Sequence, residues 1–295
     1  MNILLTGGTG FIGSSLCKKL LARGDQITVL TRRPEQLRLP IKAVDSFNTL
    51  SGDEVFDVII NLAGEPIADR PWTQRRRRVL RDSRIALTQQ LFNYIEGCKQ
   101  RPSLLINASA IGFYGDQGDD IVVEGTEAKD DFAHQLCRDW EHQAQAFEAL
   151  GIGVCILRIG LVLGRDGGFL SRLMLPFRCG LGGPLGDGQQ WMSWVHRDDV
   201  IGIIEFILDN NIVRGVFNAT APNPVSNDDF TRQLARRLHR PAFFRVPALL
   251  LKRGLGELSS LLLGSQRVQP VAIVSAGYCF KYARLDDALN EILTD

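Results

Sequence analysis

A short apolar segment that runs directly into a cluster of glycines constrains the fold of this chain more than any other feature. Residues 2–6 are mostly apolar and lead into residues 7–13, which read GGTGFIG and fit the spacing GxxGxxG. Residues 11–22 then place apolar side chains at helical spacing, and Gly24 follows where the helix should end. This order predicts a strand, a glycine-rich turn and a helix.

The glycine spacing suits the binding of a pyrophosphate. A Cβ atom in the turn would keep the backbone away from a phosphate, whereas the first N–H groups of a helix and its dipole attract one. The turn therefore predicts a dinucleotide site whose backbone contacts the phosphates, mainly through residues 9–12. The residues expected here are Gly7, Thr9, Gly10, Phe11, Ile12 and Gly13. The alternative is a turn that only packs the helix on the strand.

The end of the next strand predicts which dinucleotide binds. NAD-binding chains normally place an Asp or Glu about 20 residues after the loop, where it binds the ribose 2′-hydroxyl. Residues 26–31 are the expected strand here, and the chain continues through Thr31, Arg32 and Arg33 without an acid. A guanidinium can form charge-assisted, bidentate bonds with a 2′-phosphate, which favours NADP(H) over NAD(H). The alternative is two solvated arginines at a strand end.

Strands and helices alternate along the first two thirds of the chain. Further strands are expected at residues 56–61, 103–109, 153–158 and 215–218, and helices at residues 73–98, 132–150 and 198–208. Such alternation is typical of a parallel sheet with helices on both faces. The alternation stops in a Gly- and Pro-rich stretch at residues 164–188.

The C-terminal region predicts a few helices and little else. Ser226 or Asn227 can cap a helix that runs to His239, and further helices are expected at residues 247–254 and 285–293. We expect residues 1–165 and 190–225 to form a dinucleotide-binding domain and residues 166–189 and 226–295 a substrate-binding or cap region. The predicted fold class is α/β, a doubly wound parallel (Rossmann) sheet with a small, mostly helical C-terminal cap.

Composition excludes several classes of function. With 45% hydrophobic and 23% charged residues, the 295-residue chain has the make-up of an ordinary folded protein. Its net charge of +1 provides no overall field that would attract nucleic acid or an anionic membrane, so neither is expected as a partner. The six cysteines are scattered and predict no metal site. We expect a cytoplasmic protein that binds a small-molecule substrate, as a monomer or a homodimer.

Several further motifs resemble one superfamily. These motifs are NLAG at residues 61–64, Tyr114-Gly115 after a strand, LRIGLVLG at residues 157–164 and WVHRDD at residues 194–199. Together with GGTGFIG they resemble the extended branch of the short-chain dehydrogenases/reductases over nearly the whole chain. NLAGEPI at residues 61–67 and GLGGPLGDGQ at residues 180–189 are similar to the YfcH-type group of epimerase-like proteins, from which no substrate carries over.

The resemblance implies additional residues at the cofactor. Leu62, Ala63 and Gly64 of the NLAG motif are expected to contact it. Alignment through Thr88 places Arg84 where the extended enzymes usually carry an asparagine, with Ser83 beside it.

The catalytic residues that the resemblance implies are missing. Extended enzymes use a Ser or Thr together with a YxxxK pair, whose tyrosine is the general acid/base. In this chain Ala110 stands at the Ser/Thr position, with Ser109 one residue early, and Ala133 and Cys137 stand at the Tyr and Lys positions. A thiol at position 137 can be a nucleophile only if its pKa is depressed, and packing is the alternative.

Three residues are candidates to replace the acid/base, each with a structural alternative. Tyr114 follows a strand at the edge where ligands bind, although it can also pack the loop. Glu65 can orient substrate, or act as a base if burial raises its pKa, or serve structurally at a helix start. His134 lies near the altered YxxxK segment and can be an acid/base or a surface residue.

Other features have similar alternatives. Trp191 and Trp194 can stack on a substrate ring, or belong to a structural excursion between the domains. His196 can be a substrate ligand or a structural histidine at a strand end. The basic run at residues 75–78 covers more than one helical face and is interpreted as a solvated helix rather than a nucleic-acid site.

Two functional hypotheses follow. The first is an NADP(H)-dependent oxidoreductase or sugar-nucleotide-epimerase-like enzyme that acts on a small polar substrate without the usual Ser-Tyr-Lys set. The second is a non-catalytic NADP(H)-binding module that reports redox state to a partner. An enclosed pocket lined by Tyr114, Glu65 and Trp194 would argue against the second.

Overall fold

A parallel sheet forms the centre of the molecule, whose computed structural model describes residues 1–37, 40–210 and 214–294. Within these ranges the sheet has seven strands in the order β11-β7-β5-β4-β1-β2-β3. The strands are β1 (Asn2–Thr6), β2 (Gln26–Leu30), β3 (Lys42–Val44), β4 (Val58–Asn61), β5 (Leu104–Ala110), β7 (Gly153–Ile159) and β11 (Gly215–Ala219). All neighbouring strands pair in parallel. The strand order reverses beside β1, which confirms the predicted doubly wound fold.

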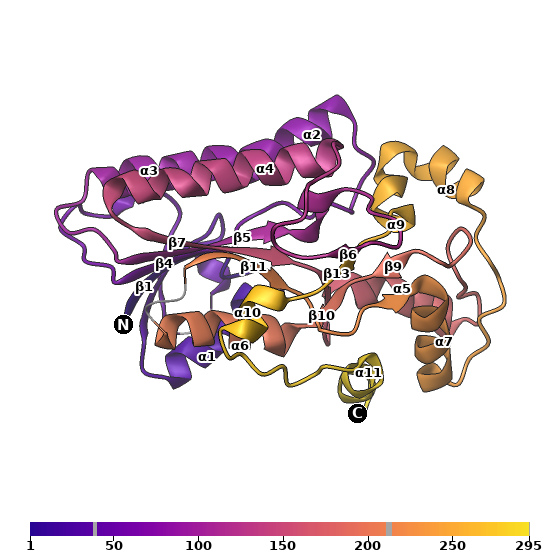
Figure 1. Cartoon of the computed structure of the whole chain (residues 1–295). Coiled ribbons are helices and arrows are strands. Elements are labelled where there is room, and N and C mark those ends of the chain that lie inside the picture. The colour runs from indigo at the N-terminus through magenta and orange to yellow at the C-terminus, as the bar shows by residue number, and fades with distance from the viewer. Residues whose placement is uncertain (38–39, 211–213, 295) are drawn as a thin grey trace.

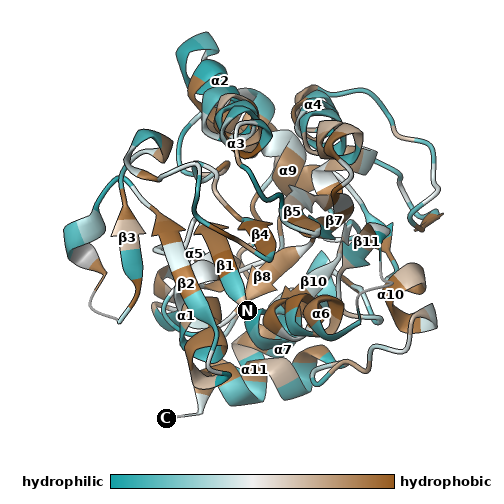
Figure 2. Ribbon diagram, turned by 90° about the vertical axis from the view of Figure 1, so that its left-hand side faces the viewer, coloured by the Kyte–Doolittle hydropathy of each residue, from teal (hydrophilic) through white to brown (hydrophobic). Residues whose placement is uncertain are grey.

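Helices cover both faces of the sheet because its strands are apolar on both faces. On one face lie α1 (Gly13–Ala22) and α6 (Arg197–Asp209), and on the other α2 (Gln74–Arg81), α3 (Leu87–Glu96) and α4 (Phe132–Gln145) (Figure 1). Ile3 and Leu5 face the core that contains α1 and α6, whereas Leu4 faces the core that contains α3. Figure 2 shows the apolar strands between helices whose outer faces are hydrophilic.

One predicted helix contains an irregular turn. Residues 73–98 were expected to form a single helix, but α2 and α3 are joined by a π-helical stretch, Asp82–Ala86, and α3 ends at Glu96. A π turn adds a residue to a helical turn and occurs often at functional sites. Here it carries Ser83 and Arg84, two of the residues expected at the cofactor.

The cap lies at one end of the molecule (Figure 1). It contains α5 (Gly168–Arg178), α7 (Asn227–Leu238), α8 (Ala248–Leu255), α9 (Ser260–Leu263) and α11 (Leu285–Leu293). Helix α5 forms within the stretch where the sequence showed only a break in the pattern, and Ser226 caps α7 as expected by accepting a hydrogen bond from Asp229 N. A separate apolar core that includes Phe177, Trp194 and Phe230 holds α5, α7 and α11 together. Helices α8 and α9 pack through Leu255 and Leu261 in another cluster, which includes Trp72 and Ala133.

Short strand pairs join the cap to the sheet domain. The pairs are β8 (Leu161–Leu163) with β10 (Trp194–His196), β9 (Trp191–Met192) with β12 (Val225–Ser226), and β6 (Ile121–Val122) with β13 (Arg267–Val268). After β13 the chain returns to the sheet domain, where α10 (Val271–Ser275) places Ile273 in the main core. No helix in the described ranges has both the length and the apolar character that crossing a membrane requires.

Candidate cofactor cleft and substrate cavity

The glycine-rich turn after β1 depends on its glycines for backbone packing. Gly7 has a φ of +75°, and a Cβ atom there would lie 2.7 Å from the carbonyl carbon of Leu62. A Cβ atom on Gly13 would collide with the carbonyl oxygen of Gly7. These two glycines are therefore required for the turn itself, because they allow α1 and the loop after β4 to approach it.

The N-terminus of α1 is open toward the turn. Ile12 is the N-cap residue, no side chain caps the helix, and its first turn carries no acid. Thr9 and Gly10 are exposed, and Gly10 N donates to Gly7 O at 2.9 Å, so the turn holds its shape through its own backbone. Exposed N–H groups at the positive end of a helix form an anion site, and this geometry fits a dinucleotide pyrophosphate.

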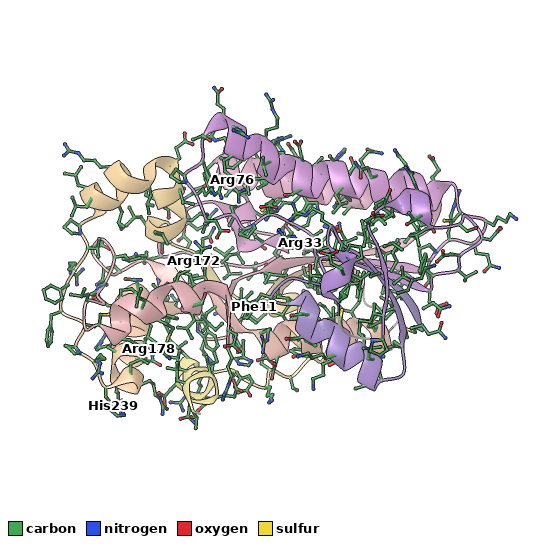
Figure 3. The ribbon with its side chains drawn as sticks, turned by 180° about the vertical axis from the view of Figure 1, so that it is seen from behind. Phe11, Arg33, Arg76, Arg172, Arg178 and His239 are labelled. Atoms are coloured by element: carbon green, nitrogen blue, oxygen red, sulfur yellow. The ribbon has the colours of Figure 1, made fainter. Side chains whose placement is uncertain are left out.

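Phe11 connects the glycine-rich turn to the start of α5. A Cβ atom on Gly167 would lie 2.8 Å from Cε2 of Phe11, and the ring also lies against Gly164 and Gly168. The guanidinium of Arg197 lies 4.9 Å from the ring centroid of Phe11. Figure 3 shows Phe11 in the middle of the molecule. Glycines at the start of α5 thus leave room for the aromatic ring of the turn.

The end of β2 carries the two arginines that the sequence singled out. Arg33 is exposed, and its N–H donates to Thr31 Oγ1 at 3.3 Å. The Arg32 side chain is 89% exposed, and its Nη1 lies 2.9 Å from Glu65 Oε1. Strand β3 flanks this edge, because Thr31 N donates to Val44 O at 2.9 Å. Both guanidiniums are accessible to a ligand at this edge.

Glu65 lies between two arginines. Its Oε1 pairs with Arg32, and its Oε2 lies 3.4 Å from Nη1 of Arg76. Nη2 of Arg76 donates to Pro66 O at 2.6 Å. Burial alone would raise the pKa of Glu65, but hydrogen bonds and charge interactions with Arg32 and Arg76 outweigh it and lower that pKa. The raised pKa that a general base at this position would need is therefore not present.

A buried hydrogen-bond network fixes the loop of the NLAG motif. Asn61 accepts from Thr6 Oγ1 at 2.6 Å and donates to Asn107 Oδ1 at 2.6 Å and to Thr88 Oγ1 at 2.9 Å. Ala63 N donates to Thr6 Oγ1 at 3.2 Å, directly after Leu62. The network holds residues 62–64 beside the glycine-rich turn, where Leu62 contacts Gly7.

Arg84 packs against the same loop. A Cβ atom on Gly64 would lie 2.8 Å from Cζ of Arg84, so only glycine fits there while the guanidinium keeps this position. Arg84 Nη2 donates to Glu65 O at 3.0 Å, and Glu65 N donates to Ser83 Oγ at 3.0 Å. The guanidinium also lies 5.3 Å from the ring centroid of Trp140. Burial lowers the pKa of Arg84.

The positions of the missing catalytic residues lie together in space. A Cβ atom on Gly112 would lie 3.3 Å from the Ala133 Cβ and 3.9 Å from the Cys137 Sγ. Burial raises the pKa of Cys137 to about 11, which makes it a neutral thiol and excludes a depressed pKa. Ser109 Oγ donates to Glu141 Oε1 at 2.6 Å.

Tyr114 belongs to a buried polar network. Its side chain has no exposed surface, and its hydroxyl donates to Asn218 Oδ1 at 2.7 Å and accepts from Arg158 Nη1 at 3.0 Å. Arg158 also pairs with both carboxylate oxygens of Glu141 at 2.9 Å. Burial raises the pKa of Tyr114. Its surroundings match the packing alternative.

His134 and His196 both make structural contacts. His134 Nδ1 lies 2.6 Å from Phe113 O, and its ring packs edge-on against the Phe113 ring. His196 is buried, accepts from Asp198 N at the start of α6, and lies 3.1 Å from Glu291 Oε2. Burial lowers the pKa of His196.

The two tryptophans expected to stack on a ligand have other contacts. Trp194 is fully buried and donates to Asn223 O at 3.1 Å. Trp191 donates to Asp119 Oδ1 at 3.1 Å, and the guanidinium of Arg267 lies 4.3 Å from its ring. Trp194 has no surface with which to stack on a substrate.

A cavity of about 980 Å³ separates the start of α4 from the cap. Its walls include Gly112 and Ala133 on one side and Gln266 and Lys252 on the other. Trp72 and Phe132 form an aromatic wall with ring centroids 4.9 Å apart, and Arg77 lies over Phe132 and pairs with Glu257. The volume is sufficient for a small-molecule ligand.

The motifs in the sequence predict only part of this cavity. Tyr114, Glu65, His134 and Trp194 are absent from the described walls, whereas Trp72, Gln266 and Lys252 are present. Gln266 and Lys252 come from parts of the cap that no motif connects to residue 133. The displaced YxxxK segment pointed to this place through Ala133, and the expected substrate-binding region at residues 166–189 contributes Gly186 and Asp187.

The chain is similar to known proteins over nearly its whole length. A family model described as the NAD dependent epimerase/dehydratase family matches residues 3–219, and a domain of unknown function matches residues 246–292. The chain is 36% identical to epimerase family protein YfhF of Bacillus subtilis over 301 residues, covering 100% of this chain and 99% of the relative. It is also 36% identical to the chloroplastic SDR39U1 homolog of Arabidopsis thaliana over 303 residues, covering 99% of this chain and 87% of the relative.

Two solved structures are similar over nearly all of the chain. One is human epimerase family protein SDR39U1 with NADPH, with a TM-score of 0.90, 32% identity and 99% coverage of both chains. The other is a nucleoside-diphosphate sugar epimerase from Corynebacterium glutamicum, with a TM-score of 0.81 and 31% identity, covering 99% of this chain and 58% of that one. The comparisons confirm the resemblance to epimerase-like short-chain dehydrogenases/reductases.

Proposed function

The chain belongs to the NAD-dependent epimerase/dehydratase family, and we propose that it is an NADP(H)-dependent oxidoreductase or epimerase-like enzyme for a small polar substrate. One observation supports this most directly. The open N-terminus of α1, the arginines after β2 and the loop of Gly64 lie at the carboxyl ends of adjacent strands, where doubly wound folds bind dinucleotides. The human relative bears its NADPH on the same fold.

The cofactor-binding residues follow from this arrangement. Backbone N–H groups of residues 9–12 bind the pyrophosphate, and the accessible guanidiniums of Arg32 and Arg33 bind the 2′-phosphate. Thr31 and residues 62–64 form the walls beside them. When bound, the nicotinamide supplies or accepts the hydride. The remaining chemistry belongs to side chains of this chain.

Arg84 provides a positive charge where the extended enzymes have a lysine. Cys137 occupies the lysine position as a neutral thiol, and Arg84 of the π turn is the positively charged group near it. The guanidinium donates to Glu65 O and to Ser83 Oγ, so it is a fixed cation beside the loop of Gly64. We assign to Arg84 the stabilisation of negative charge on a ligand at this loop.

The proton transfer is not assigned to a tyrosine. Tyr114 is engaged with Arg158 and Asn218, Glu65 with Arg32 and Arg76, and His134 with Phe113. None of the three lies in the described walls of the cavity. In the proposed enzyme the proton is exchanged with solvent, and Glu65 stays a carboxylate paired with Arg32 and Arg76.

The alternative is a cofactor-binding sensor without catalysis. The loss of Ser, Tyr and Lys at positions 110, 133 and 137 supports it. The described cavity is not the pocket of Tyr114, Glu65 and Trp194 that would argue against the sensor. It still supports the enzyme, because it reaches Ala133 and is large enough for a substrate. A sensor has no need for such a cavity at this position.

The first experiment tests the cofactor. NADPH and NADH are titrated into the purified protein by fluorescence or calorimetry, with Arg32→Ala and the matched control Arg78→Ala, an exposed arginine on α2. We expect Arg32→Ala to weaken NADPH binding about tenfold or more while NADH binding and the control are unchanged. An unchanged NADPH/NADH affinity ratio in Arg32→Ala would contradict the cofactor assignment.

The second experiment tests catalysis. Carbonyl compounds and nucleotide sugars are offered to the NADPH-bound protein, and absorbance of the cofactor is followed for the wild type, Arg84→Ala and Tyr114→Phe. We expect turnover that Arg84→Ala reduces by a factor of about 100 and that Tyr114→Phe changes little. Tight NADPH binding without turnover on any compound would favour the sensor.

A further inference from the structure

The outer edge of the cap carries exposed apolar side chains. This cap edge consists of residues 175–181 at the end of α5 and residues 240–253, which lead from α7 into α8. Its exposed apolar residues are Leu175, Leu181, Phe243, Phe244, Leu249 and Leu250. Phe243 is 83% exposed, far more than is usual for an aromatic side chain in a folded protein. A group of such residues marks an interaction surface.

Backbone hydrogen bonds hold the two parts of the cap edge together. Val246 N donates to Pro184 O at 2.8 Å and Gly186 N donates to Val246 O at 2.9 Å. Arg240 Nε donates to Arg178 O at 3.0 Å. The chain from α7 to α8 follows the extreme edge of the molecule at the cap end (Figure 1). Phe243 and Phe244 are therefore presented outward on a fixed loop.

The cap edge is also basic. Its residues include five cations and no Asp or Glu, although the chain as a whole has a net charge of only +1. The cations are Arg178, Arg240, Arg245, Lys252 and Arg253. Arg245 pairs with Asp228, and the other four have no ion-pair partner among the described residues. Figure 3 shows Arg178 at the cap end of the molecule.

We propose that the cap edge binds the surface of an anionic lipid bilayer. Exposed Phe and Leu side chains flanked by unpaired cations are the combination that inserts at the boundary of headgroups and acyl chains while neutralising lipid phosphates. A second copy of this chain does not fit, because the same face would bring both sets of cations together. The association is peripheral, since only side chains of one edge enter the bilayer.

Charge complementarity selects this partner over an apolar protein surface. Among the acids around the cap edge, Asp228 pairs with Arg245 and Glu257 pairs with Arg77. Arg178, Arg240 and Arg253 have no ion-pair partner among the described residues, so they are available to an external anion. The net charge of the whole chain predicts no membrane partner, because the local excess of cations at the cap edge is cancelled elsewhere in the chain.

Sedimentation with vesicles tests the proposal on the full chain. Wild-type protein is mixed with vesicles of phosphatidylcholine alone and with vesicles of equal parts phosphatidylcholine and phosphatidylglycerol. We expect binding to the anionic vesicles only, with weakening at high salt because screening acts on the cations. Phe243→Ser with Phe244→Ser, and separately Arg178→Gln with Arg253→Gln, should each reduce binding about tenfold or more.

Matched controls separate the cap edge from general effects of charge and hydrophobicity. Lys18→Gln with Lys19→Gln on α1 removes the same charge, and Val271→Ser with Val274→Ser on α10 removes exposed apolar groups. Both controls should bind like the wild type, and all variants should keep their melting temperature and NADPH binding. Three results would overturn the proposal: an equal loss of vesicle binding in the controls, equal binding to neutral and anionic vesicles, or no binding to the anionic vesicles.

Discussion

Glu65 holds Arg32 across the edge of the sheet, with 2.9 Å between Oε1 and Nη1. Arg32 follows β2 and Glu65 follows β4, so the pair joins loops on either side of β1. The carboxylate occupies a guanidinium that we assign to the 2′-phosphate of the cofactor. Glu65 and that phosphate therefore compete for the same cation.

Replacing Glu65 by glutamine should strengthen NADPH binding. The substitution releases Arg32 from its ion pair, whose worth at an exposed site is about 0.2–1 kcal/mol, so we expect a gain of roughly two- to fivefold in NADPH affinity. NADH affinity should be unchanged, because NADH has no 2′-phosphate. Calorimetric titration of both cofactors measures the ratio, with Glu35→Gln, another acid of this region, as the control. Weaker NADPH binding in Glu65→Gln would show that the carboxylate supports the site instead.

Substituting two glycines of the glycine-rich turn should have different effects, one on stability and the other on NADPH binding. Gly13→Ala places a methyl group against the Gly7 carbonyl and should destabilise the fold by about 2 kcal/mol or more. At Gly10 the nearest atom to an added Cβ is Gly7 O at 3.2 Å, so Gly10→Ala should fold but bind NADPH at least about tenfold more weakly. Thermal unfolding and cofactor titration separate the two effects. Gly52→Ala, with its nearest atom at 3.6 Å, is the control and should change neither.

The elements that could be predicted from the sequence are those with a strong local pattern. The buried strands and the helices around them have clear apolar periodicity. The turn at Gly7 is predicted by the GxxGxxG spacing of its glycines. Strand β3 has only three residues, and α5 contains Pro176 and follows a glycine cluster, so neither presents a helical or strand period. The glycines before α5 make room for Phe11. This contact joins segments far apart in the sequence, so a local sequence pattern does not predict it.

The candidate site was predictable in part for the same reason. Cofactor residues follow strands directly, so their place at the sheet edge comes with the fold. The cavity instead combines Ala133 with Gln266 and Lys252, which are more than a hundred residues away in sequence. The pKa of Glu65 also depends on Arg76, whose approach requires the turn from Pro66 to α2. Such contacts exist only in three dimensions.

The buried pair of Glu141 and Arg158 should dominate the stability of the domain interior. Both side chains are almost fully buried, and Glu141→Gln leaves the guanidinium without a counter-charge, so we expect a loss of about 3–5 kcal/mol in the free energy of unfolding. Asp139→Asn, which removes a partly exposed acid paired with Arg81, should cost no more than about 1 kcal/mol. Urea unfolding of both variants checks the difference. Similar losses would mean that the buried network adds little to stability.

The cysteines should divide into two reactivity classes. Cys179 and Cys279 are exposed, whereas burial raises the pKa of Cys17 and of Cys137 to about 11. Only the thiolate is alkylated, so the buried pair should stay unmodified by iodoacetamide at neutral pH while the exposed pair reacts. Mass spectrometry after timed labelling measures each site. Unfolding in urea should make Cys17 and Cys137 react at the rate of the exposed pair, and fast labelling of native Cys137 would contradict its burial.

Placing the lysine of the extended enzymes at position 137 should lower the stability of the fold, and this loss should be smaller when Arg84 is replaced as well. Cys137→Lys buries a second cation next to Arg84, whose pKa burial already lowers, so we expect a loss of several kcal/mol in stability. Arg84→Asn should reduce that loss in the double variant, because the asparagine carries no charge. Unfolding free energies of the two single variants and the double variant form a thermodynamic cycle, in which we expect a favourable coupling of about 1–3 kcal/mol. Additive losses would show that Arg84 and residue 137 do not share one charge site, and the assignment of the lysine's role to Arg84 would then fail.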